Sequence, residues 1–165
     1  MGLRLFSLAI LGLLTACGYQ ALDPGLGGGR TLWVPTTTNQ SRWRGVEADL
    51  THELRDSLRT QLDVRLGHKN PDLILHTKLL RIQRGSAISG RGGTVLAGRA
   101  NLQVEWKLEN AGGEILASGT ISRELEFFPQ EGETAYLAFD DLISDMAEQI
   151  TLETGVALRP AIATP

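Results

Sequence analysis

The feature that most constrains the fold is a period-two pattern near the middle of the chain. Between residues 100 and 109, polar side chains alternate with apolar ones, which are Ala100, Leu102, Val104, Trp106 and Leu108. Such alternation is typical of a β-strand with one face in a core and the other in water. The turn-forming residues 110–113 follow. A second run then carries apolar residues at Ile115, Ala117, Ile121, Leu125 and Phe127. The sequence therefore predicts an antiparallel hairpin.

Three further segments have the composition of strands. Residues 31–34 form a short apolar and β-branched run that Pro35 stops, and residues 63–66 alternate over a shorter length. Residues 72–84 carry Leu73, Leu75 and Leu79 on one face and Ile74, Leu80 and Ile82 on the other, so a long strand partly covered on both sides is expected. The glycine-rich residues 85–98 are expected to be a mobile loop between two long strands.

Two segments carry helical periodicity. Apolar residues recur every fourth position from Val46 to Leu62, which predicts a helix over about residues 45–61 with acidic residues near its start. Apolar residues also recur at three- and four-residue steps from Ala135 to Ile150. This second pattern predicts an amphipathic helix of about five turns that ends before Gly155.

The order of these elements predicts the fold class. Helices with one apolar face pack on strands with alternating faces as two layers. We therefore expect an α+β two-layer sandwich, in which two helices cover one face of a mostly antiparallel or mixed sheet of about four strands. The other face, polar at Gln103, Glu105 and Lys107, is left for water or for a partner.

The N-terminal residues look like a lipoprotein signal. Arg4 precedes an apolar run of about ten residues, far fewer than the roughly 20 that span a bilayer, and this run leads through two small residues to Cys17. The pattern resembles a bacterial lipobox, so we predict lipidation of Cys17 and cleavage before it. An ordinary signal peptide cleaved near Ala16, with Cys17 as a free thiol, is the alternative. Gly18, rather than an aspartate, follows the cysteine and favours the outer membrane.

The predicted domains follow from these signals. Residues 1–16 are the signal peptide, 17–30 a lipidated, glycine-rich tether, 31–157 a single α+β domain, and 158–165 a frayed tail. Removal of residues 1–16, which contain one arginine and no acidic residue, changes the formal charge from −3 to −4. Because this charge is small, acidic and dispersed, we expect no nucleic-acid partner. Cys17 is the only cysteine, so a disulfide framework and a thiolate metal site are excluded.

Three catalytic or ligand-binding patterns are incomplete. His52 and Glu53 look like the start of a zinc-protease helix, but Asp56 stands where the second histidine is needed. Gly85 and Gly90 are spaced as in a phosphate loop, but the lysine and hydroxyl residue that should follow are absent. The acidic residues of the last helix suit a solvated face. We therefore expect no catalytic residue, no metal and no cofactor besides the lipid on Cys17, which argues against a lipid-anchored hydrolase.

Several short segments, in a fixed order, resemble the lipopolysaccharide-assembly lipoproteins of the LptE family. These segments are Cys17-Gly18-Tyr19, Leu32-Trp33-Val34-Pro35 with Asn39 shortly after, Gly45-Val46-Glu47-Ala48-Asp49-Leu50-Thr51, Pro71-Asp72-Leu73-Ile74-Leu75 and the closing helix. The resemblance covers most of the mature length. The glycine-rich residues 85–98 depart from the family pattern.

The resemblance implies a non-enzymatic protein. Such lipoproteins sit as a plug in the lumen of the outer-membrane barrel LptD, assist its assembly and help deliver lipopolysaccharide to the outer leaflet. The implied partners are an LptD-like barrel, lipopolysaccharide and, through the lipid anchor, the inner leaflet of the outer membrane. By position, the candidate lipopolysaccharide contacts are Arg81, Arg84, Arg91 and Arg99; ordinary surface arginines are the alternative. The competing function is an adaptor of another envelope complex, such as a peptidoglycan synthase activator.

Overall fold

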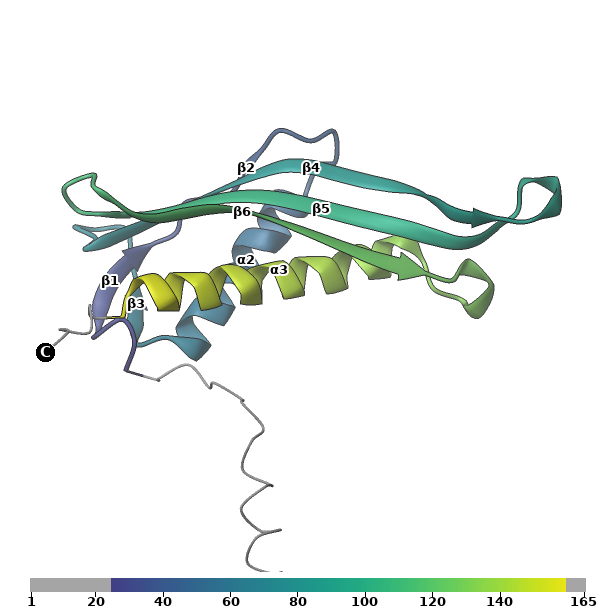
Figure 1. Ribbon diagram of the computed structural model, residues 1–165. Coiled ribbons are helices and arrows are strands. Elements are labelled where there is room, and N and C mark those ends of the chain that lie inside the picture. The colour runs from purple at the N-terminus through teal and green to yellow at the C-terminus, as the bar shows by residue number, and fades with distance from the viewer. Residues whose placement is uncertain (1–24, 160–165) are drawn as a thin grey trace, which may run out of the picture.

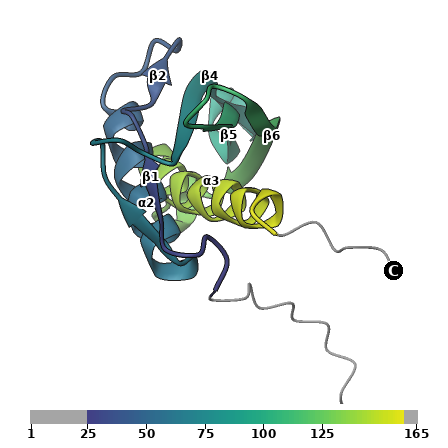
Figure 2. The same ribbon diagram turned by 90° about the vertical axis from the view of Figure 1, so that its left-hand side faces the viewer.

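The computed structural model describes residues 25–159, so the predicted signal peptide and Cys17 lie outside the described residues. The described chain is an α+β fold in which two helices cover one face of a mixed sheet (Figures 1 and 2). The predicted class and two-layer arrangement are confirmed.

The strands are β1 (Arg30–Trp33), β2 (Thr38–Asn39), β3 (Val64–Leu66), β4 (Leu73–Ser89), β5 (Val95–Asn110) and β6 (Ile115–Phe127). The helices are α2 (Val46–Gln61) and α3 (Ala135–Ala157), with short 3₁₀ turns η2 (Arg91–Gly93) and η3 (Pro129–Glu131).

The sheet has the order β3-β1-β4-β5-β6, and β2 pairs with β4 beside β1. β1 pairs in parallel with β3 and β4, and β2 also pairs in parallel with β4, whereas β4, β5 and β6 form an antiparallel meander. The described sheet has six strands, so the expected count of about four is wrong. The two-residue strand β2 lies in a polar segment without alternation, and its register is set by tertiary contacts: the Thr37 and Thr77 hydroxyls lie 2.7 Å apart in the core.

The predicted hairpin is the centre of the core. All five apolar positions of β5 between residues 100 and 108 are at most 3% exposed. β5 pairs with β4 on one side and with β6 on the other, and its inward side chains from Ala100 to Leu108 are buried in the core. The period-two pattern of the sequence is thus the pattern of a central strand with one face against helices.

The helices bury the predicted stripes. Leu50, Leu54 and Leu58 of α2 are fully buried, and the apolar positions of α3 from Ala138 to Ile150 are at most 4% exposed. α3 does not end before Gly155 as expected but continues to Ala157. Gly155 is itself buried inside the last turn, and Leu158 is 6% exposed, so packing extends the helix past the residue that was predicted to stop it.

A β-bulge exchanges the two faces of β4 in its second half, so that side chains expected on the outer face lie on the helix side and the reverse. Leu79 pairs with Val104 but Arg81 pairs with Gln103, so Leu80 is an extra residue in β4. As a result Ile82, which the alternation places on the outer face, lies on the helix side and is 7% exposed. The predicted assignment of side chains to the two faces of this strand is therefore correct only up to Leu79.

The glycine-rich residues 85–98 are mostly strand rather than loop. β4 continues to Ser89 and β5 begins at Val95, so the connection consists only of residues 90–94. Gly98 pairs with Phe127 of β6, and a Cβ atom at Gly98 would lie 2.2 Å from the Phe127 ring. This glycine is needed because an aromatic ring lies against the backbone, and not because the chain turns there.

The domain begins earlier and ends later than the sequence predicts. The predicted tether reaches Arg30, yet Leu26 is 6% exposed and its carbonyl accepts a 2.7 Å hydrogen bond from the Asp63 amide. A Cβ atom at Gly27 would lie 2.5 Å from the Asp63 carbonyl oxygen, and Gly27 has φ of +113°. Residues 25–30 therefore pack as part of the domain, and so does Leu158, which was expected to begin a frayed tail.

Among residues 25–159, no helix has the length and apolar character needed to cross a membrane.

Candidate functional site

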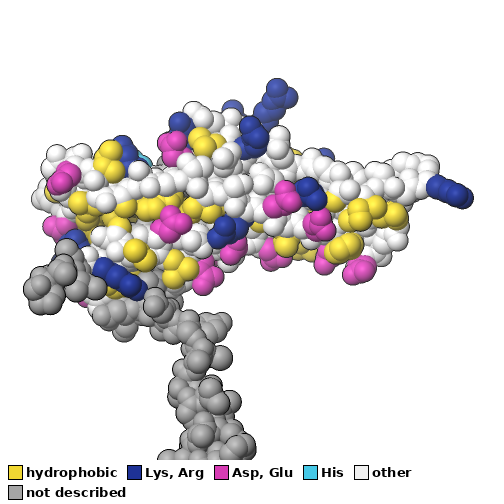
Figure 3. Space-filling model, viewed as in Figure 1, with side chains coloured by type: hydrophobic (Ala, Val, Ile, Leu, Met, Phe, Trp, Pro, Cys, Tyr) yellow, Lys and Arg dark blue, Asp and Glu magenta, His cyan; other side chains and the backbone are white. Residues whose placement is uncertain are grey.

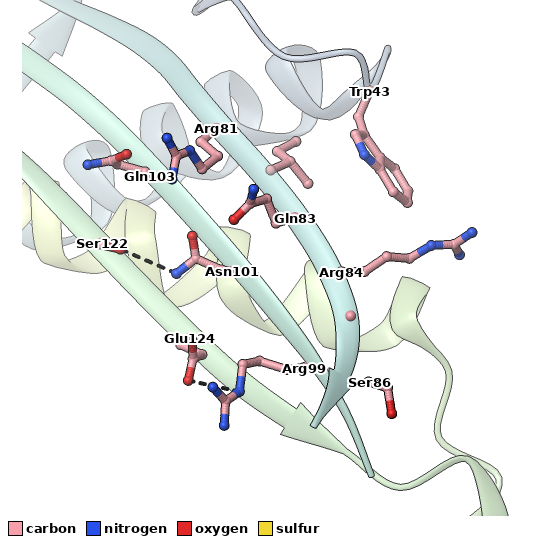
Figure 4. A pocket seen from close by; sticks show the side chains of 12 residues that line it. Trp43, Arg81, Gln83, Arg84, Ser86, Arg99, Asn101, Gln103, Ser122 and Glu124 are labelled. Carbon is pink, nitrogen blue, oxygen red and sulfur yellow. Dashed lines mark hydrogen bonds and ion pairs between the residues drawn. The ribbon is translucent and has the colours of Figure 1, made fainter. Parts of the chain in front are cut away.

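An open groove of about 830 Å³ runs along the second half of β4. It extends over the outer face of β5 and β6, the face that the helices do not cover. Figure 4 shows its side chains extending from three adjacent strands and from the loop that carries Trp43.

Cross-strand register builds the polar floor of this groove. The bulge at Leu80 turns Arg81 and Gln83 outward, and their partners on β5 are Gln103 and Asn101. Asn101 donates hydrogen bonds to the Ser122 hydroxyl and the Arg123 carbonyl of β6, at 3.3 and 3.1 Å. The floor is therefore a set of amide and guanidinium groups on a rigid sheet, a surface that suits a polar, hydrogen-bonding ligand.

Arg99 lies in the groove with its charge already paired. Its guanidinium group lies 3.1 Å from Glu124 and 3.1 Å from Glu126, both on β6 (Figure 4 shows the first pair). All three side chains are about half exposed. An anionic ligand at Arg99 would have to compete with two carboxylates, so Arg99 is a weaker candidate contact than its position suggests.

Arg84 reaches the groove from the other side of β4. Its register partner is the core-facing Ala100, and its guanidinium carbon lies 5.3 Å from the centroid of the Trp43 ring. Trp43 in turn packs on Phe139 of α3, with ring centroids 5.1 Å apart. In Figure 4, Arg84 extends beyond the edge of β4, away from Arg81 and Gln83. The Trp43–Arg84 stack thus forms a wall at the open edge of the groove.

The loop carrying Trp43 is fixed by a partly buried hydrogen-bond network. The Asn39 amide donates to the Trp43 carbonyl at 2.5 Å and to the Glu47 carboxylate at 2.7 Å. The backbone N–H of Glu47 at the start of α2 and the Asn39 amide hold the pKa of the Glu47 carboxyl below its ordinary value of 4.5. The negative charge of Glu47 therefore stabilises the folded position of this loop.

We expect Glu47→Gln to destabilise the protein at pH 7, by less than about 1 kcal/mol because the group is partly solvated. A lowered folded-state pKa contributes stability above the ordinary value, and this contribution is lost as the pH falls through the folded pKa. The difference from the unsubstituted protein should therefore shrink below pH 4.5. Urea unfolding at pH 7 and at acid pH measures the free energy of unfolding of both proteins. The control is Glu53→Gln, which changes an exposed residue on the same helix. If the difference in stability did not change with pH, the negative charge of Glu47 would not be what stabilises the loop.

The four candidate arginines do not form one cluster. Arg81, Arg84 and Arg99 line the groove, but Arg84 does so from the opposite face of β4, and Arg91 lies in η2 at the tip of the β4–β5 hairpin, outside the groove. Among the described residues, Arg81 and Arg84 have no ion-pair partner. The sequence did not single out Trp43, Gln83 or Asn101 as site residues, although Asn101 belongs to the polar face of the period-two pattern.

Two other groupings of charged side chains have structural partners. His52 is exposed and lies 3.5 Å from Asp56 one helical turn away, as expected of a surface residue. At the other end of the outer face, Lys107 lies 2.6 Å from Glu109, and this contact holds the pKa of Glu109 low. Within residues 25–159, no group of His, Cys, Asp and Glu side chains has the geometry of a metal site.

A comparison with family models decides the family. The model described as "LptE: Lipopolysaccharide-assembly" matches residues 29–153, a span that contains all six described strands, α2 and most of α3. The chain belongs to the LptE family. This is a family of non-enzymatic lipoproteins, and membership in it suggests a role in lipopolysaccharide assembly.

Solved structures share the LptE-like fold at low sequence identity. XCC0632 from Xanthomonas campestris has a TM-score of 0.61 and 12% identity over 78% of this chain and 85% of its own. The PelC dodecamer from Paraburkholderia phytofirmans has a TM-score of 0.53 and 16% identity, and the match covers 76% of this chain and 91% of PelC. Lipoprotein GNA1162 from Neisseria meningitidis has a TM-score of 0.50 and 12% identity, and the match covers 74% of this chain and 99% of GNA1162. At such identities the similarity concerns the fold alone. A comparison with curated protein sequences gives no match.

Proposed function

We propose that this LptE-family protein is an outer-membrane lipoprotein, anchored by lipid on Cys17, that plugs an LptD-like barrel and assists its assembly. In this role it helps to deliver lipopolysaccharide to the outer leaflet without catalysing a reaction. The observation that carries the proposal is the family match over residues 29–153.

The groove supports the part of the proposal that concerns lipopolysaccharide. Lipopolysaccharide presents sugar hydroxyls and phosphates, and the groove offers amides for the first and guanidinium groups for the second. Arg81 lies on the polar floor and Arg84 at the wall, and neither is paired with a carboxylate of the described residues. We therefore assign the principal phosphate contacts to Arg81 and Arg84, a supporting contact to Arg99, and a separate contact to Arg91 at the hairpin tip.

The test of the barrel proposal is co-purification. The full-length protein is extracted from membranes in mild detergent and recovered through an affinity tag at its C-terminus. A large outer-membrane barrel protein is expected to elute with it in a fixed ratio. Recovery of cell-wall enzymes instead, such as a peptidoglycan synthase, would contradict the plug and favour the envelope-adaptor function.

We expect Arg81→Ala to weaken binding of purified lipopolysaccharide by about 10- to 100-fold, the effect of losing one charge-assisted hydrogen bond. Arg99→Ala should have a smaller effect because Glu124 and Glu126 already engage that side chain. The matched control is Arg59→Ala, since Arg59 is an exposed arginine on α2 that pairs with Asp56. Titration with lipopolysaccharide measures all three variants. Equal affinities for the Arg81 and Arg59 variants would remove Arg81 from the site.

A further inference from the structure

A second hollowed surface lies at the end of the domain where the described chain begins and ends. It consists of two adjoining grooves, of about 400 and 620 Å³, which share Leu116 at the start of β6 and Ala157 at the end of α3. Figure 1 shows both termini of the described chain at this end and the β4–β5 hairpin at the opposite end. We call the two grooves together the anchor-end surface.

Apolar side chains stand exposed on this surface. Leu116 is 40% exposed and Val156 is 58% exposed, and both line the 400 Å³ groove. Hydrophobic side chains are visible along this flank of the domain in Figure 3. Two large apolar side chains exposed in one groove are available to contact an apolar partner.

The floor of the anchor-end surface is rigid. Trp106 is 3% exposed, and its indole N–H donates a 3.0 Å hydrogen bond to Glu153 of α3. A Cβ atom at Gly119 would lie 2.9 Å from that same indole nitrogen, so the neighbouring strand lies directly against the ring. The exposed residues therefore project from a fixed base, and their exposure does not come from a loose segment.

Positive charges surround the point where the described chain begins. The Arg30 side chain donates a 2.8 Å hydrogen bond to the Gly27 carbonyl, and the Arg65 side chain donates a 2.9 Å hydrogen bond to the Gly29 carbonyl. Arg159 lines the 620 Å³ groove and is exposed. Within residues 25–159, none of these three arginines forms an ion pair. Their guanidinium groups keep N–H donors available for phosphate oxygens.

The chain outside the described residues limits how far this end can lie from a bilayer. Gly25 lines the 620 Å³ groove and is eight residues after Cys17. Eight residues span at most about 28 Å when fully extended. Lipidation of Cys17 would therefore hold the anchor-end surface within about 28 Å of the membrane surface, where even weak contacts are effective because binding is intramolecular.

We propose that the anchor-end surface is a membrane-docking surface. Leu116 and Val156 enter the boundary between lipid headgroups and acyl chains, and the arginines near Gly25 contact lipid phosphates. Burial of apolar area and attraction of each basic side chain to anionic headgroups act together. The inference rests on the proposed lipidation of Cys17 and adds an orientation: the end of the domain that carries Leu116 and Val156 faces the lipid surface that holds the anchor.

The test places a fluorescent probe on the docking surface. Val156→Cys is prepared as full-length, lipidated protein, in which acylated Cys17 leaves the new thiol as the only reactive one. The thiol is labelled with an environment-sensitive fluorophore, and the protein is reconstituted into vesicles of phosphatidylethanolamine and phosphatidylglycerol. The matched control is Leu137→Cys, labelled in the same way, because Leu137 is 53% exposed near the opposite end of the same helix.

The label at residue 156 is expected to shift to shorter wavelength and to be quenched several-fold more by bromolipids than the label at residue 137. Adding Leu116→Glu should remove most of this difference while the protein still floats with the vesicles. Equal quenching at both positions would overturn the docking surface. The barrel co-purification is measured separately, on the unlabelled protein. If no barrel protein co-purifies but the label at residue 156 is still quenched, the proposed function is contradicted and the docking surface is not.

Discussion

Gly98→Ala is expected to destabilise the folded protein by about 2–4 kcal/mol, or to lower its melting temperature by roughly 10 °C. The new Cβ atom would lie 2.2–2.6 Å from three atoms of the Phe127 ring, closer than any real contact allows. Phe127 is 9% exposed and belongs to the core cluster, so its ring cannot move without giving up packing. Thermal and urea unfolding measure the loss.

A matched control exists one strand away. Gly85 on β4 pairs with Arg99 of β5 and has an ordinary backbone conformation, and a Cβ atom at this position would have no neighbour within 4 Å. Gly85→Ala should therefore change stability by less than about 1 kcal/mol. In a Phe127→Ala background, where the ring is gone, Gly98→Ala should cost far less than in the natural chain. An undiminished cost there would mean that the ring is not the cause.

The parts of the fold that the sequence predicts correctly are those where most of one face of an element is buried. The alternation on β5 and the four-residue stripe on α2 both identified core positions that are at most 3% exposed, from Ala100 to Leu108 and at Leu50, Leu54 and Leu58. Burial of a single face requires apolar residues at a regular spacing, because a polar residue at any of these positions would lie in the core.

The errors of prediction come from tertiary contacts that produce no regular spacing of apolar residues in the sequence. The extra residue Leu80 shifts the facing of β4, and nothing local in the sequence marks it. Glycines are usually turn residues, so residues 85–98 were expected to be a loop, but Gly98 serves a close approach to Phe127. The strand β2 has only two residues and depends on the threonine pair at the core edge.

The candidate site was only partly predictable for the same reasons. Basic residues around the expected loop pointed to the right region, but the extended strands separate Arg91 from the groove, and the bulge places Arg84 against Trp43. One signal was available in the sequence. Arg99 and Asn101 continue the polar positions of the period-two pattern toward the N-terminus, which indicates that β5 begins inside the segment expected to be a loop.

Cys17→Ser is expected to abolish acylation completely. The thiol is the nucleophile and the point of attachment in the proposed modification, and a serine hydroxyl is far less nucleophilic because its proton is lost only at much higher pH. Cells grown with labelled palmitate should incorporate no label into the variant, and the protein should remain as a precursor that retains residues 1–16. Mature-sized, unlabelled protein would instead favour the ordinary signal peptide with cleavage near Ala16.

The same variant separates the lipid from the docking surface. A membrane anchor needs more than one signal for stable attachment, and exposed apolar residues such as Leu116 and Val156 alone provide a weak one. With cleavage before residue 17 supplied artificially, the Cys17→Ser domain should therefore release into the soluble fraction, whereas Leu116→Glu with Cys17 intact should stay membrane-bound but lose its orientation. Retention of the non-lipidated mature domain on vesicles would show that the docking surface binds membranes without the lipid, and that Cys17 only reinforces it.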